Sequence, residues 1–406
     1  MTDHAPHAVP RAIPVPQPRP HAGRRAALAC MVTLAVALGV GRFAFTPLLP
    51  LMLHGGALDL RHGGWLASLN YAGYFVGAVS CVALRVAPAR IVRAGLVATA
   101  LLTLAMGATQ QFWIWAVVRF AAGAVSAWTF VFASQWGLRR LAQLGANEWG
   151  GVIYTGPGVG IIATGLFVSA AGGLGARTGW IGFGLISALL AALVWSTFGE
   201  DTRALAPRPA ASAAASGARE PHAGRRADAF WLVLLYGVPG FGYIITATFL
   251  PVIARHALPG SAWPDLFWPM FGAALIAGAL LAARFPLHWD NRLMLAGAYV
   301  LQAVGIALGI VWPNAAGFSF GSVLIGLPFT AITLFAMREA RLLRGERAAA
   351  LMGYATAAYG IGQIAGPLVA APLAASTGSF SPSLWLAALA LVAGAIGLVW
   401  RVWHTR

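Results

Sequence analysis

Lysine is absent from this chain of 406 residues, and acidic side chains are scarce. Charged residues make up 9% of the sequence, whereas a soluble domain carries roughly a quarter. Hydrophobic residues make up 59%, and the mean hydropathy is +0.75. So little charge cannot give a globule of this size a polar surface. The composition therefore excludes an ordinary soluble protein and indicates an integral membrane protein.

Cysteine is nearly absent as well. The two cysteines, Cys30 and Cys81, lie in separate apolar stretches and have no metal-ligand spacing around them. We therefore expect neither a disulfide framework nor a metal site. The sequence also has no glycine-rich phosphate-binding loop preceded by a strand, so we expect no nucleotide cofactor and no other cofactor.

Apolar runs long enough to cross a bilayer occur twelve times. Hydrocarbon about 30 Å thick needs roughly 20 helical residues. Many of the 49 glycines and 24 prolines lie inside these runs, which transmembrane helices tolerate. The predicted spans are Ala26–Leu53, Trp65–Leu84, Ile91–Ala108, Phe112–Trp136, Gly150–Gly172, Trp180–Phe198, Phe230–Ala254, Leu266–Ala283, Leu293–Trp312, Phe318–Met337, Ala348–Ser376 and Leu384–Trp400. We therefore expect an all-α integral membrane fold with twelve transmembrane helices.

The 27 arginines indicate the orientation of these spans. Arg61, Arg177 and Arg255 fall in connections on one side of the membrane, and Arg42 and Arg119 fall inside spans. The other 22 lie on the opposite side, together with both termini. Positive charge collects on the cytoplasmic side. We expect a multi-pass protein of the bacterial cytoplasmic (inner) membrane with both termini in the cytoplasm, and no nucleic-acid partner despite the net charge of +16.

One long polar segment divides the spans six and six. It is rich in Ala, Pro, Ser and Arg, and the start of the chain is rich in Pro. We predict a disordered cytoplasmic tail over 1–25, an N-terminal six-helix bundle over 26–198, a cytoplasmic linker over 199–229, a C-terminal six-helix bundle over 230–401 and a short cytoplasmic tail over 402–406.

An internal repeat relates the two halves at an offset of about 201 to 203 residues. The matched positions are Gly41 and Pro50 with Gly242 and Pro251, Gly158–Ala163 with Gly360–Ala365, and Gly123 and Phe132 with Gly326 and Phe335. Three matches in one register indicate two bundles related by a pseudo-two-fold axis along the membrane normal, the parallel-repeat plan of carriers that rock between two states.

These features resemble the major facilitator superfamily. Within it, Gly41–Pro50 (GRFAFTPLLP) and Gly240–Pro251 (GFGYIITATFLP) look like the YbfB/YjiJ-type branch. Arg119 followed by Gly123 resembles the superfamily's fourth-span Arg-Gly motif. Gly156-Pro157 with Gly160 resembles the fifth-span Gly-Pro motif often associated with exchangers. The resemblance implies a secondary carrier with a cavity between its two six-helix halves.

Two arginines are the charged residues left inside the spans. No Asp, Glu or His lies in a span core, so a proton relay of carboxylates or imidazoles is not expected. Arginine stays charged and binds carboxylate or phosphate through two hydrogen bonds. Arg42 and Arg119 are therefore candidates for binding an anionic substrate. The alternative for Arg119 is hydrogen bonding between helices, and the alternative for Arg42 is packing or snorkelling.

Polar side chains on other spans complete the predicted site. Asn70 and Tyr74 lie on the second span, Tyr243 on the seventh, and Tyr359 and Gln363 on the eleventh. Tyrosine combines an apolar ring with a hydroxyl group, which suits a pocket of few polar groups, although it also joins helices. The residues predicted to bend or gate the helices are Pro47, Pro50, Gly156, Pro157, Gly160, Pro251, Gly366 and Pro367.

The sequence thus predicts a secondary active transporter of a small molecule that works by alternating access. The leading substrate is a small organic anion, moved by exchange or ion coupling. The alternatives are an efflux carrier for neutral or amphipathic compounds, similar to drug or sugar efflux, and a membrane sensor of the same fold that transports nothing. We expect no enzyme, because the spans hold no nucleophile–base pair and no paired carboxylates. The expected partners are the substrate, a coupling ion and the lipid bilayer, and the expected state is a monomer.

Overall fold

Each half of the chain folds into helical spans, because a backbone in hydrocarbon must satisfy its hydrogen bonds within its own segment. The computed structural model describes residues 20–199, 223–282, 284–286, 288–345 and 348–405. Twelve helices in these ranges are long and apolar enough to cross a membrane, and the same ranges contain no strand. The predicted all-α membrane fold with twelve spans is confirmed.

The N-terminal half consists of α1 (Pro20–Leu34), η1 (Ala35–Val40), α2 (Phe45–His54), α3 (Leu60–Ser80), α4 (Pro88–Ala108), α5 (Phe112–Gln143), α6 (Gly150–Ile153), α7 (Gly156–Ala171) and α8 (Gly175–Val194), with short 3-10 turns at Cys81–Ala83, Asn147–Trp149, Gly172–Leu174 and Trp195–Gly199. The C-terminal half consists of α9 (Ala223–Ala257), α10 (Pro264–Ala282), α11 (Asn291–Val311), α12 (Ala315–Gly326), α13 (Phe329–Arg344), α14 (Ala348–Thr377) and α15 (Ser381–Thr405).

The predicted boundaries of the tails and the linker differ from the helix ends. Helix α1 begins at Pro20, inside the predicted tail 1–25, and α9 begins at Ala223, inside the predicted linker 199–229. Helix α15 continues to Thr405, inside the predicted tail 402–406. Hydropathy marks the part of a helix that lies in hydrocarbon, and a helix extends past that part into the polar region. The rest of the predicted tail and linker lies outside the described residues.

Three spans are interrupted by a turn. The first span passes from α1 through the π-helical segment η1 into a turn at residues 41–44 before α2 begins. The fifth span breaks at residues 154–155 and the tenth at residues 327–328. In contrast, α9 and α14 run through their internal prolines without a break. The interruption of the first span is the one that places the candidate site, because Arg42 lies in it.

Polar side chains begin several of the helices. Asp59 precedes α3, and its carboxylate accepts a hydrogen bond from the backbone N–H of His62 at 2.8 Å. This bond, reinforced by the His62 side chain, lowers the pKa of Asp59 below its ordinary value. Asn314 accepts from the backbone N–H of Gly317 at 3.0 Å and begins α12 in the same way.

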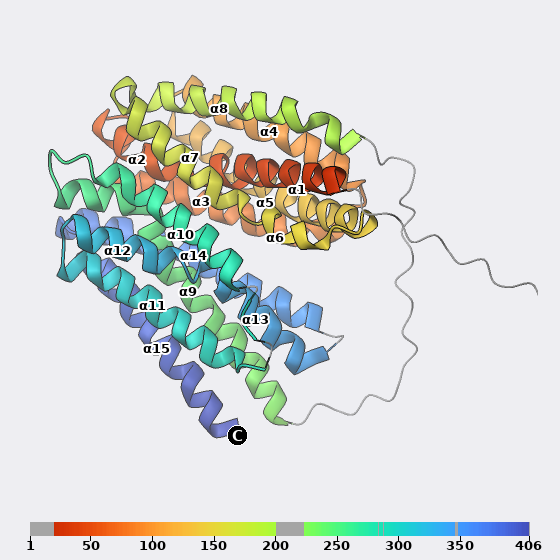
Figure 1. Ribbon diagram of the computed structural model, residues 1–406. Coiled ribbons are helices and arrows are strands. Elements are labelled where there is room, and N and C mark those ends of the chain that lie inside the picture. Colours follow the sequence, from red (N-terminus) through yellow and green to blue (C-terminus); the bar gives the residue numbers. More distant parts are fainter. Residues whose placement is uncertain (1–19, 200–222, 283, 287, 346–347, 406) are drawn as a thin grey trace, which may run out of the picture.

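The two halves lie close together at one end and diverge toward the other (Figure 1). The wide end is the one where the N-terminal half finishes and α9 begins, and we call it the linker end. Three side-chain hydrogen bonds join the halves among the described residues. Thr46 donates to the carbonyl of Ala247 at 2.9 Å, Ser68 donates to the carbonyl of Ile364 at 2.8 Å, and the hydroxyls of Tyr71 and Thr248 are 2.9 Å apart.

Glycines allow the helices to approach each other closely. Gly39 in η1 lies against Gly160 in α7, and a Cβ added to Gly160 would come within 2.5 Å of the Ala35 carbonyl oxygen and 2.6 Å of the Gly39 Cα. Real Cβ atoms do not approach backbone this closely, so a side chain at Gly160 would push the first and fifth spans apart.

Gly160→Ala is therefore expected to destabilise the protein by roughly 1–3 kcal/mol, the usual cost of overpacking. Thermal unfolding of the purified protein in detergent measures this. The matched control is Gly297→Ala in α11, where an added Cβ meets nothing within 4 Å. An unfolding temperature that falls equally in both variants, or in neither, contradicts the assignment.

Candidate functional site

The interruption of the first span is held together by Arg119. Its side chain is 2% exposed. Its two terminal nitrogens donate to the backbone carbonyls of Gly41 at 3.4 Å and Arg42 at 3.3 Å, and its guanidinium carbon lies 4.7 Å from the centre of the Phe45 ring. A turn inside a membrane span leaves carbonyls that the helix does not satisfy. Arg119 supplies donors to them from α5.

Asn70 hydrogen-bonds to the backbone of Arg119. Its amide donates to the Arg119 carbonyl at 2.9 Å, and its other side-chain atom, Oδ1, is buried without a partner. The backbone of α3 also passes close to α5, because an added Cβ at Gly123 would meet the Asn70 carbonyl at 2.0 Å. Asn70 therefore joins the second and fourth spans directly behind the arginine.

Arg42 lies against aromatic rings. Its guanidinium carbon is 4.2 Å from the centre of the Tyr74 ring, 5.1 Å from that of Tyr71 and 5.2 Å from that of Phe43. The side chain is 5% exposed, and its Nε has no hydrogen-bond partner. Cation–π contacts thus take the place that a counter-ion usually fills.

Within the described ranges, no acidic residue forms an ion pair with Arg42. The ion pairs in these ranges lie near the ends of spans. Arg255 pairs with Asp265 at 2.5 Å, Arg292 with Asp290 at 3.4 Å and with Glu339 at 3.7 Å, and Arg401 with Asp228. Arg42 and Arg119 are also close enough to repel each other. The centre of the molecule is therefore positive and without a compensating carboxylate.

Three tyrosines of the C-terminal half face this positive centre. The rings of Tyr236 and Tyr359 stack at 5.0 Å with an interplanar angle of 27°, and those of Tyr243 and Tyr359 at 6.0 Å with an angle of 22°. The Gln363 amide donates to the Tyr243 hydroxyl. Helices α3 and α14, which carry Tyr74 and Tyr359, pack directly against each other, since a Cβ added to Gly360 would meet Phe75 Cδ2 at 2.8 Å. The stack and Arg42 therefore lie on either side of the boundary between the halves.

The predicted site residues therefore come together in space. Arg42 and Tyr74 touch, Arg119 and Asn70 support the segment that carries Arg42, and Tyr243, Tyr359 and Gln363 form the opposite wall. The sequence prediction did not include Tyr71 and Tyr236. Their spacing offered a signal, since Tyr71 precedes Tyr74 by three residues and Tyr236 precedes Tyr243 by seven, which places each pair on one helix face.

The residues predicted to bend helices have different surroundings. An added Cβ at Gly156 would meet the Met31 carbonyl oxygen at 2.3 Å, and one at Gly366 would meet Ile244 Cγ2 at the same distance, so both glycines allow close packing, as Gly160 does. Pro50, Pro251 and Pro367 lie inside continuous helices. Pro47 lies in the first turn of α2, and Pro157 is the second residue of α7. Whether these residues bend or gate during transport stays a prediction.

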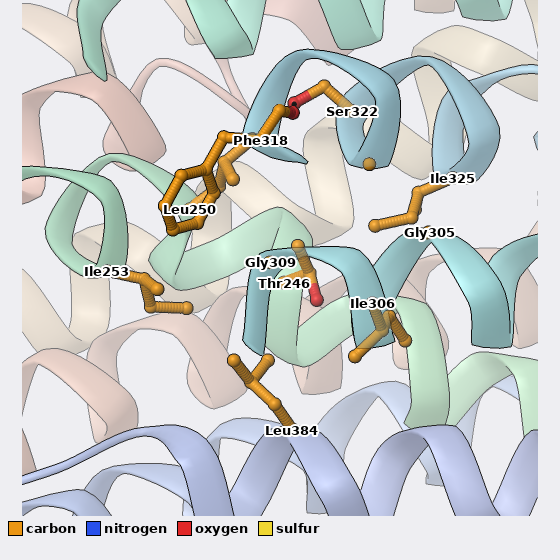
Figure 2. A pocket seen from close by; sticks show the side chains of 11 residues that line it. Thr246, Leu250, Ile253, Gly305, Ile306, Gly309, Phe318, Ser322, Ile325 and Leu384 are labelled. Carbon is orange, nitrogen blue, oxygen red and sulfur yellow. Dashed lines mark hydrogen bonds between the residues drawn. The ribbon is translucent and has the colours of Figure 1, made fainter. Parts of the chain in front are cut away.

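A small cavity lies elsewhere, inside the C-terminal half. Figure 2 shows side chains from α9, α11, α12 and α15 around it. Its lining is apolar except for the hydroxyls of Thr246 and Ser322. Ser322 donates back to the Phe318 carbonyl at 2.7 Å, whereas the Thr246 hydroxyl has no partner. Because helices of one half surround this cavity, we place the candidate site at Arg42, between the halves.

The described spans have the architecture of an integral membrane protein built of two six-helix halves, with this site between them. A solved structure of a point mutant of the nucleoside transporter NupG superimposes with a TM-score of 0.70, covering 93% of this chain and 99% of that one at 15% identity. At this identity the likeness concerns the fold alone.

The sequence itself matches, over residues 34–398, the family model described as "Uncharacterised MFS-type transporter YbfB". The match covers most of the chain, so the chain belongs to this family of the major facilitator superfamily, and the resemblance is confirmed. A "Chloramphenicol resistance protein" of Streptomyces lividans is 37% identical over 158 residues, which are 37% of this chain and 38% of that protein.

The contacts of the two arginines predict different results when each is replaced. Arg119→Gln leaves the Gly41 and Arg42 carbonyls without their donors, which costs roughly 1–3 kcal/mol of stability. Arg42→Gln removes ring contacts instead and is expected to cost less. Thermal unfolding of both variants in detergent checks this order. Equal losses, or a larger loss for Arg42→Gln, would show that Arg119 is not the supporting residue.

Proposed function

We propose that this protein is a secondary active transporter that carries a small organic anion between its two halves, by exchange or coupled to an ion. Arg42 carries this proposal. A charged side chain inside a membrane protein costs about 2.5–3.5 kcal/mol on insertion scales. A cation–π contact returns about 0.5–2 kcal/mol. Three such contacts can offset much of the cost, yet no acidic side chain of the described residues pairs with Arg42, and an anionic substrate would take that place.

The divergence of the two halves supports alternating access. The hydrogen bonds between the halves lie in the part of the spans away from the linker end. If the arginine-rich linker end faces the cytoplasm, this structure corresponds to an inward-facing state of a protein in the cytoplasmic membrane. Transport would require the substrate to reach Arg42 from the cytoplasm in one state and from the other side in a state in which the three hydrogen bonds are broken.

A second candidate function is efflux of neutral or amphipathic compounds. The Streptomyces lividans relative is named for chloramphenicol resistance, and Arg42 is surrounded by aromatic rings that also suit an uncharged ligand. A carrier of this kind would not depend on the charge of Arg42. A sensor without transport activity would give no exchange with any substrate.

Counterflow in proteoliposomes separates these functions. We expect purified protein to exchange at least one anion from a panel of radiolabelled small organic anions, tested with and without a proton gradient. Arg42→Gln should reduce the exchange at least about tenfold, since the ligand loses its charge partner, while insertion and the gel-filtration profile stay unchanged. The matched control is Arg61→Gln, at an exposed position. Exchange that persists in Arg42→Gln, or exchange of neutral compounds only, argues against an anion carrier.

The hydrogen bonds between the halves predict a shift of the conformational equilibrium. Thr46→Val with Ser68→Ala removes two of them, and each is worth about 0.5–1.5 kcal/mol. We expect the variant to populate the state that is open at the end opposite the linker.

Spin labels at His54→Cys and Ser261→Cys, in a protein without Cys30 and Cys81, report this opening as a longer distance. Both labelled positions are exposed. An unchanged distance distribution would mean that these hydrogen bonds do not hold the halves together.

A further inference from the structure

Tyrosine is concentrated around Arg42. The chain has eight tyrosines, and five of them form one cluster between the halves, which we call the tyrosine cluster: Tyr71 and Tyr74 from α3, Tyr236 and Tyr243 from α9, and Tyr359 from α14. Tyr71 links the two halves directly, since its hydroxyl lies 2.9 Å from that of Thr248 in α9. The site thus combines one cation with a wall of rings on each side.

The hydroxyl groups of the cluster are largely engaged within the protein. The Tyr71 hydroxyl bonds to Thr248 at 2.9 Å, the Tyr236 hydroxyl donates to Thr333 at 3.1 Å, and the Tyr243 hydroxyl accepts from Gln363. A tyrosine whose hydroxyl is already bonded offers a ligand its ring more than its oxygen. These three hydroxyls are therefore already bonded within the protein, and the rings of the cluster remain as contact surface for a ligand.

Tyr74 and Tyr359 provide the surface that a ligand would meet. Both are partly exposed, whereas Tyr71, Tyr236 and Tyr243 are buried. Tyr74 lies over Arg42 from the N-terminal half, and Tyr359 lies at the centre of the stack in the C-terminal half. Of the five tyrosines, these two are therefore the ones that a ligand between the halves could contact.

We propose that the transported anion is an aromatic carboxylate, which binds Arg42 through its carboxylate and the rings of Tyr74 and Tyr359 through its aromatic ring. This inference rests on the proposed anion transport and specifies its substrate class. The carboxylate would bind the guanidinium of Arg42, which aromatic rings surround and no acidic side chain of the described residues pairs with. An aliphatic anion would engage only the arginine, and a neutral aromatic compound would engage only the rings. An aromatic carboxylate engages both.

Calorimetric titration of the detergent-purified protein tests this without depending on transport. Benzoate and cyclohexanecarboxylate carry the same charge and have nearly the same size, and they differ in aromaticity. We expect benzoate to bind at least about fivefold more tightly, as expected for one aromatic contact. Tyr359→Leu and Tyr74→Leu should each reduce this ratio toward one. Tyr359→Phe should preserve the ratio, because phenylalanine keeps the aromatic ring. Preserved binding in Tyr359→Phe would also show that the site remains folded. Tyr354→Leu is the matched control, at a tyrosine that is 68% exposed and outside the cluster.

The outcomes separate this inference from the proposed function. If both carboxylates bind equally and Arg42→Gln abolishes both, the anion site stands and the aromatic assignment is overturned. If neither binds while counterflow of other anions depends on Arg42, the aromatic assignment is likewise overturned. If benzamide, which is neutral, binds as tightly as benzoate, the role of the carboxylate is overturned and the anion proposal fails with it. A clear preference for benzoate that Tyr359→Leu removes and Tyr359→Phe keeps supports the inference.

Discussion

A permanent positive charge in a membrane interior without acidic side chains is the constraint on which the rest of this structure depends. Arg119 meets it with backbone carbonyls from the interruption of the first span, and Arg42 meets it with aromatic rings. The two arginines differ in the groups that surround their guanidinium. Backbone carbonyls bond both terminal nitrogens of Arg119 and fix its position, whereas aromatic rings surround the guanidinium of Arg42; the Nε of each arginine is buried without a partner. Arg119 is therefore tied to the backbone of the first span, and Arg42 is not tied to a carbonyl in this way.

Close packing of backbone against backbone makes this arrangement possible. Small residues allow the first span to lie directly on the fifth and the second on the fourth. These contacts bring the interruption of the first span within reach of a side chain from α5. The many glycines of the sequence thus serve contacts in which small residues let the backbones of two helices meet.

Much of the fold can be read from the sequence, because apolar length and the placement of arginine are local properties. The positions of Arg42 and Arg119 stand out for the same reason, since a charge inside an apolar run is visible without a structure. The interruption beside Arg42 cannot be read from the sequence, because the side chain that stabilises it lies 78 residues away from Gly41 in the chain. The contribution of Tyr236 depends on how the two halves face each other, which hydropathy does not encode.

The π-helical segment η1 contains one residue more than an α-helical turn would need. A π turn holds about one residue more than an α turn, and η1 ends at Val40, directly before the turn that contains Arg42. Taking up that residue into regular α-helix would rotate everything that follows by about 100°, the angle of one residue in an α-helix. Arg42 would then point in a new direction while α1 stayed in place. A change of η1 into regular α-helix would therefore alter the direction of Arg42 without moving α1.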